Sequence, residues 1–150
     1  DVALMWTSDK FLLGLASFLT GHVFYISGLH SGIEWTSTGV VWAPLLFLGS
    51  GMFWVLRSGL GKMQVPVLVY ILVILIMSGL AWDRHLQLEL PQTLFAACGA
   101  ILFLISDAML AWNRFRMKFK SAQFFILSTY YVAQSAIAIS MSQVTSRVLS

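Results

Sequence analysis

Two aspartates interrupt apolar stretches in which a charge is unexpected. Asp107 lies within GAILFLISDAMLAW, and Asp1 precedes the apolar run Val-Ala-Leu-Met-Trp. A carboxylate at the centre of a membrane-spanning helix costs about 2.5–3.5 kcal/mol on insertion scales, so an intramembrane acid indicates a functional site. The structural alternative for both residues is an Asp that hydrogen-bonds a neighbouring helix or caps a broken one.

The two aspartates are predicted to lie at the same depth. Each precedes a tryptophan by five residues, Trp112 for Asp107 and Trp6 for Asp1. At 1.5 Å per residue, both carboxylates would then lie about 7–8 Å inside the ends of their helices. Two nearby acids cannot both ionise easily, so a pair can keep one proton, and one acid can donate while the other accepts.

Further polar side chains could join these acids. His22 lies deep in its apolar run, and Tyr25 follows on the same helical face. Tyr130, Tyr131 and Gln134 lie in the middle of the last apolar run. For each of them the alternative is a hydrogen bond between helices that only holds a bundle together. A single imidazole without cysteines or clustered carboxylates does not indicate a metal, so neither a metal nor another cofactor is predicted.

A series of apolar stretches must position these residues. Of the 150 residues, 59% are hydrophobic and 10% are charged, which excludes a soluble domain, a disordered tail and a nucleic-acid binder. We predict an all-α, polytopic transmembrane helix bundle that forms one integral-membrane domain over residues 1–150. A helix stub at 1–6 would precede five full spans, at 11–29, 40–56, 65–82, 93–112 and 122–142.

The gaps between these spans differ in charge. Gaps 7–10, 57–62 and 113–121 hold seven Lys and Arg, while the gaps on the other side and the C-terminal tail hold two. The positive-inside rule places the first set in the cytoplasm and the C-terminus outside. The short loops favour a bacterial inner membrane over an endoplasmic reticulum.

Several residues near the span ends receive a structural interpretation. We expect Asp83 and Arg84 to lie in a loop and His85 to be solvated. Glycines within the spans, Gly99 among them, would allow close helix packing. The tryptophans near span ends are typical of an aromatic belt at the lipid interface: Trp35, Trp42, Trp54, Trp82 and Trp112.

Three stretches carry a resemblance to a known family. They are residues 1–6 with 11–18 and 21–26, residues 99–115, and residues 128–140. With these motifs in this order, the chain resembles the YhhN-like membrane proteins, the lysoplasmalogenase family, also called alkenylglycerophosphocholine or alkenylglycerophosphoethanolamine hydrolases. The resemblance implies a bundle of about eight transmembrane helices, of which the first two or so would be missing here.

The resemblance also implies site residues and a reaction. The family's two proposed catalytic aspartates map onto Asp1 and Asp107, and its substrate-binding elements map onto His22, Tyr25, Tyr130, Tyr131 and Gln134. The implied substrate is a lysophospholipid, a lysoplasmalogen. Hydrolysis of its vinyl ether bond would give a fatty aldehyde and glycerophosphoethanolamine or glycerophosphocholine, without a cofactor.

Two carboxyls suit this chemistry. Protonation of the β-carbon of a vinyl ether gives an oxocarbenium-like cation to which water adds, so one Asp would be the general acid. The other would stabilise the cation and activate water, as in glycoside hydrolysis. Cations on the same side could hold the phosphate, and the alternative for each is that it only follows the positive-inside rule: Arg57, Lys62, Arg114 and Arg116.

Two other functional classes stay open on the residues alone. Intramembrane Asp and His residues also mark proton relays, so a proton-coupled membrane transporter is one alternative. A non-catalytic lipid-binding membrane protein is the other, and it would tolerate Asn in place of both Asp1 and Asp107.

Overall fold

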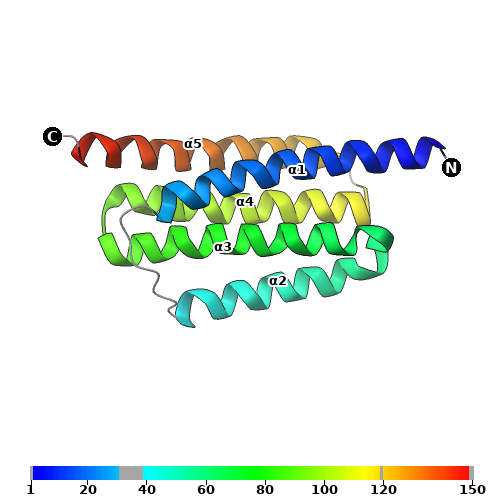
Figure 1. The fold of residues 1–150 in the computed structure, drawn as a ribbon, viewed down its shortest axis with the longest axis horizontal. Helices are drawn as coiled ribbons and strands as arrows, with labels where there is room; N and C mark the ends of the chain where they lie inside the picture. The colour runs from blue at the N-terminus through cyan, green and yellow to red at the C-terminus, as the bar shows by residue number, and fades with distance from the viewer. Residues whose placement is uncertain (1, 31–38, 119, 149–150) are drawn as a thin grey trace.

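The protein is an all-helical bundle in a computed structural model that describes residues 2–30, 39–118 and 120–148. Side chains are described for residues 11–30, 39–118 and 120–140. The elements are α1 (Val2–His30), α2 (Gly39–Leu60), the 3-10 helix η1 (Gly61–Met63), α3 (Gln64–Leu88), α4 (Pro91–Phe115) and α5 (Ala122–Val148). The helices lie side by side along one long axis (Figure 1). The all-α prediction is confirmed for the described part of the chain.

Four stretches of the described residues are long and apolar enough to cross a membrane: Phe11–His30, Gly39–Leu88, Pro91–Phe115 and Ala122–Ser140. The second stretch contains both α2 and α3, which run back along each other from η1 (Figure 1). A helix satisfies its own backbone hydrogen bonds, which hydrocarbon requires. The chain is therefore an integral membrane protein.

The start of α1 differs from the prediction. A stub at 1–6 and a loop at 7–10 were expected, but one continuous helix runs from Val2 to His30. The sequence Thr-Ser-Asp-Lys at 7–10 holds neither glycine nor proline, so nothing in it ends a helix. Lys10 is consequently a helical residue rather than a loop residue.

The connection between α3 and α4 is also shorter than the predicted gap 83–92. It consists of Glu89 and Leu90 alone. Glu89 adopts a left-handed conformation (φ 49°), and its N–H donates to the carbonyl oxygen of His85 at 2.8 Å, which ends α3. Pro91 starts α4 at a position where its missing N–H costs nothing.

Asp83 and Arg84 are therefore helical and buried, which corrects their assignment to a loop. Arg84 Nη1 donates to the carbonyl of Leu29 at 2.8 Å, in the last turn of α1, where carbonyl groups lack helical partners. Asp83 Oδ2 accepts from the indole N–H of Trp42 at 3.3 Å, and Trp42 is half-buried. His85 likewise has a partner, the hydroxyl of Thr93 at 3.0 Å.

The core lies around α3 and α4. Its largest cluster joins α1, α3, α4 and α5, and two smaller clusters join α2 to α3 and α4. Gly99 lets α4 approach α5 closely: a Cβ there would lie 2.9 Å from the carbonyl oxygen of Ala133. α1 and α5 cover one side of this core, and α2 alone covers the other side (Figure 1).

Candidate active site

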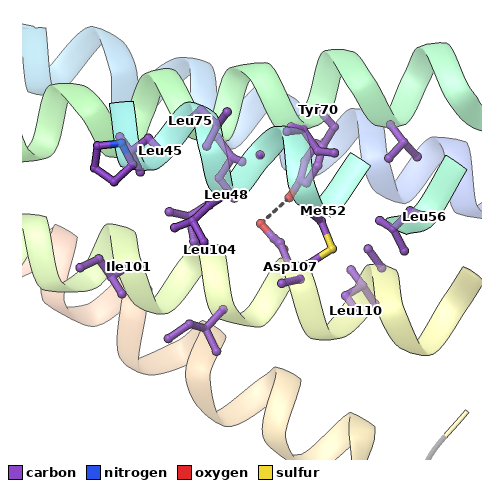
Figure 2. A pocket seen from close by; sticks show the side chains of 18 of the residues that line it. Leu45, Leu48, Met52, Leu56, Tyr70, Leu75, Ile101, Leu104, Asp107 and Leu110 are labelled. Atoms are coloured by element: carbon purple, nitrogen blue, oxygen red, sulfur yellow. Dashed lines mark hydrogen bonds between the residues drawn. The ribbon is translucent and has the colours of Figure 1, made fainter. Parts of the chain in front are cut away.

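Asp107 of α4 is the centre of a small polar cluster. Only 11% of its side chain is exposed. Tyr70 of α3 donates its hydroxyl to Asp107 Oδ2 at 2.9 Å, as Figure 2 shows. From α1, His22 Nε2 approaches the same carboxylate oxygen at 4.0 Å. Three helices thus bring together one acid, one phenol and one imidazole.

His22 is held in a defined orientation. Its side chain is 2% exposed, and its ring stands edge-on to Tyr70 and Phe103, with centroids 5.6 and 5.2 Å away. The ring Nδ1 lies 2.7 Å from the carbonyl oxygen of Phe18, which can only accept, so Nδ1 carries a proton. Nε2 has no hydrogen-bond partner among the described residues and faces Asp107. In the neutral ring this nitrogen is a hydrogen-bond acceptor. At 4.0 Å from the carboxylate oxygen it is too far away for a direct hydrogen bond.

An apolar groove of about 610 Å³ lies beside this cluster. Most of its lining comes from α2, α3 and α4, and Figure 2 shows leucines along it on either side of Asp107. Asp107 is the only charged residue among the described residues that line it. A groove of this kind can hold a hydrocarbon chain and present one carboxyl group to it.

A second, smaller pocket of about 170 Å³ lies on the α1 side of the cluster. His22 and Phe103 form part of its wall, and its polar groups come from α1 and α5. In it the Gln134 amide donates to the Tyr130 hydroxyl. Since a water molecule takes about 30 Å³ in the liquid, the pocket has room for a few of them.

The structure brings most of the predicted site residues together. Asp107 and His22 face each other, while Tyr25, Tyr130 and Gln134 meet His22 in the second pocket. Tyr131 lines neither pocket and is 61% exposed. Asp1 lies outside the described residues, so its pairing with Asp107 stays a prediction. Among the described side chains of α1, His22 is the one that approaches Asp107, and it lies twenty residues after the helix start at Val2.

Tyr70 is the site residue that the sequence reasoning missed. It is the one polar side chain among residues 65–77, and it lies five residues inside the predicted span 65–82. That isolation was a usable signal. Among the described residues, no group of three His, Cys, Asp or Glu side chains could hold a metal ion.

Comparisons with known proteins identify the family of the chain. Human lysoplasmalogenase TMEM86B is 32% identical over 140 residues, human lysoplasmalogenase TMEM86A 32% over 142, and mouse lysoplasmalogenase TMEM86B 30% over 142. Each alignment covers 93% of this chain, but the chain spans only 57%, 59% and 57% of those relatives. No solved structure matches. The YhhN family matches residues 1–141, and the chain belongs to that family.

Proposed function

We propose that these helices belong to an intramembrane hydrolase that cleaves the vinyl ether bond of lysoplasmalogens. Its products are a fatty aldehyde and glycerophosphoethanolamine or glycerophosphocholine. The observation that carries the proposal is Asp107: one nearly buried carboxyl, held by Tyr70, and the only charged group among the described residues that line the groove. The relatives' names supply the substrate class, and the groove suits its single hydrocarbon chain.

Asp107 is the proposed general acid. Its proton passes to the β-carbon of the vinyl ether, whose π electrons form the new C–H bond, and the α-carbon becomes an oxocarbenium ion. The carboxylate left behind lies next to that cation and stabilises it. The Tyr70 hydroxyl, 2.9 Å from Oδ2, stabilises the carboxylate through a charge-assisted hydrogen bond.

Water must then add to the cation and lose a proton. His22 Nε2 has no hydrogen-bond partner among the described residues and faces Asp107 from the edge of the second pocket, so we propose it as the acceptor of that proton. The hemiacetal collapses to the aldehyde, and the glycerol oxygen leaves as an alcohol. The second acid predicted from the sequence, Asp1, is the other proposed acceptor.

The test uses the full-length protein, purified in detergent. Lysoplasmalogen and a lysolipid with a saturated alkyl ether are supplied separately, and released aldehyde is measured. The proposal predicts aldehyde from the vinyl ether only, because protonation of a saturated chain gives no oxocarbenium ion. No aldehyde from folded protein with either lipid contradicts the proposal.

Two variants assign the second role. If His22 accepts the proton of water, His22→Gln loses most of the rate while Asp1→Asn keeps it. The opposite result assigns the role to Asp1. Ser27→Ala is a control, since this exposed hydroxyl bonds the carbonyl of Val23 in its own helix and Ser27 is not among the described residues that line either pocket.

A facing Asp and His also suit a proton-coupled transporter, the second candidate. A transporter or a non-catalytic lipid-binding protein would release no aldehyde in this assay. The proposed ligand is the lysophospholipid. Membrane lipid surrounds the helix bundle. The preference for a bacterial inner membrane rests on the short loops and stays a prediction.

A further inference from the structure

We propose that the groove between α2, α3 and α4 is a ruler for the length of the substrate's hydrocarbon chain. The chain runs from Asp107 toward the end of the bundle where α3 meets α4, and the phosphate-bearing head points to the opposite end. This proposal rests on the proposed function, because it takes the lysolipid as the occupant of the groove.

Asp107 divides the groove into two unequal arms. In α3, groove residue Leu86 lies sixteen residues beyond Tyr70, about 24 Å along the axis. In the other direction, α4 contributes groove residues only as far as Phe115, eight residues or about 12 Å from Asp107. One lipid chain fills about 15 Å, half of a 30 Å hydrocarbon core, so only the long arm accommodates it.

The charges at the two ends give the same direction. Arg57 and Arg116 directly follow groove residues Leu56 and Phe115 in the sequence, at the end of the short arm, and both are exposed. Arg116 also contacts Ser58 at 3.3 Å, which holds it over the end of α2. A phosphate is attracted to such a pair. At the far end of the long arm, the exposed charge among the described residues is the acidic Glu89, which repels a phosphate.

One face of α2 lines the groove with side chains at regular intervals along its length. Val41, Leu45, Leu48, Met52 and Leu56 recur at spacings of three and four, and all of them line the groove. Figure 2 places Met52 beside Asp107, with Leu48 and then Leu45 farther along the long arm. From the level of Met52, Leu48 lies about 6 Å and Val40 about 18 Å along the helix.

A larger side chain at Leu48 and one at Val40 should exclude hydrocarbon chains of different length. A tryptophan at Leu48 blocks the long arm close to Asp107, whereas one at Val40 leaves most of the arm open. Both native side chains are exposed at the lip of the groove, 60% and 85%, so the bundle can accept the larger ring. Phe47→Trp is the matched control, because Phe47 is an 80% exposed neighbour that does not line the groove.

The test measures two quantities on the full-length protein with a series of chain lengths. The first is the affinity for saturated alkyl lysolipids, which are not cleaved, and the second is the rate of aldehyde release from the matching vinyl ethers. Each buried CH₂ contributes about fourfold in affinity, so wild type should bind long chains more tightly than short ones. Leu48→Trp should lower the long-to-short affinity ratio by about tenfold or more, and Val40→Trp by much less.

Three results would overturn the ruler: equal ratios in both groove variants, a larger effect at Val40 than at Leu48, or the same effect in Phe47→Trp. The affinity measurement distinguishes failure of this proposal from failure of the proposed function. Graded affinities without any aldehyde support the ruler and contradict the hydrolase. Aldehyde release with no dependence on chain length in any variant supports the hydrolase and overturns the ruler.

Discussion

Replacing Tyr70 by phenylalanine tests how Asp107 is held ready for proton transfer. The substitution removes one hydroxyl, the donor of the 2.9 Å hydrogen bond to Asp107 Oδ2. It keeps the ring that stands 5.6 Å from the imidazole of His22. The packing around His22 is therefore preserved, while the carboxyl loses its donor from α3.

The expected magnitude follows from how this hydrogen bond changes during the reaction. A hydrogen bond to a neutral group contributes about 0.5–1.5 kcal/mol and one to a charged group about 1.5–3 kcal/mol. Asp107 is neutral before it gives up its proton and becomes anionic as the oxocarbenium ion forms. The difference of about 1–1.5 kcal/mol stabilises the transition state alone, so Tyr70→Phe should lower kcat by about five- to tenfold.

The assay is the rate of aldehyde release from lysoplasmalogen by full-length protein, measured over a range of substrate concentrations. We expect kcat to fall and KM to change by less than about twofold, because the hydrogen bond strengthens only as the carboxyl of Asp107 loses its proton. Ser27→Ala, which removes an exposed hydroxyl, should leave both parameters unchanged. An unchanged kcat in folded Tyr70→Phe, or a loss confined to KM, would refute this reasoning.

Two further predictions concern the stability of the bundle. Gly99→Val should destabilise the packing of α4 on α5 by about 1–3 kcal/mol, since a Cβ at Gly99 would already lie 2.9 Å from the Ala133 carbonyl oxygen. The measurement is Tm in detergent, which should fall. Gly14→Ala is the control and should not lower Tm, because a Cβ at Gly14 would have no atom within 4 Å. Arg84→Met should also lower Tm, because the Leu29 carbonyl loses a charged donor worth about 1.5–3 kcal/mol. Its kcat should stay within about twofold of wild type, since Arg84 lies fourteen residues from Tyr70 along α3; an unchanged Tm would contradict the contact.

The bundle was predictable because hydropathy determines which segments enter hydrocarbon. Each of the five predicted spans lies within one helix. The helix ends were less predictable, since polar residues near a span end were taken as loop. Arg84 shows why this fails: its guanidinium bonds the carbonyl groups that end α1, so it is buried inside a helix. Sequence spacing alone does not reveal that partner, because it comes from 55 residues away.

The site was predictable where a residue type was out of place. Asp107 and His22 stood out as polar groups in apolar runs, and they do face each other. Tyr70 was missed because a tyrosine is ordinary in a membrane protein, and only the fold brings it to Asp107. Tyr130 and Tyr131 were predicted together, yet neighbouring residues on a helix point about 100° apart, and only Tyr130 lines a pocket.

The central claim is that Asp107 supplies the proton that cleaves the vinyl ether. The most direct measurement is aldehyde release by full-length Asp107→Asn, a variant of nearly the same shape that cannot act as an acid. The account predicts a loss of at least about 100-fold in kcat, the range of general acid catalysis, while an uncleaved alkyl lysolipid still binds. Folded Asp107→Asn that releases aldehyde at close to the wild-type rate would contradict it.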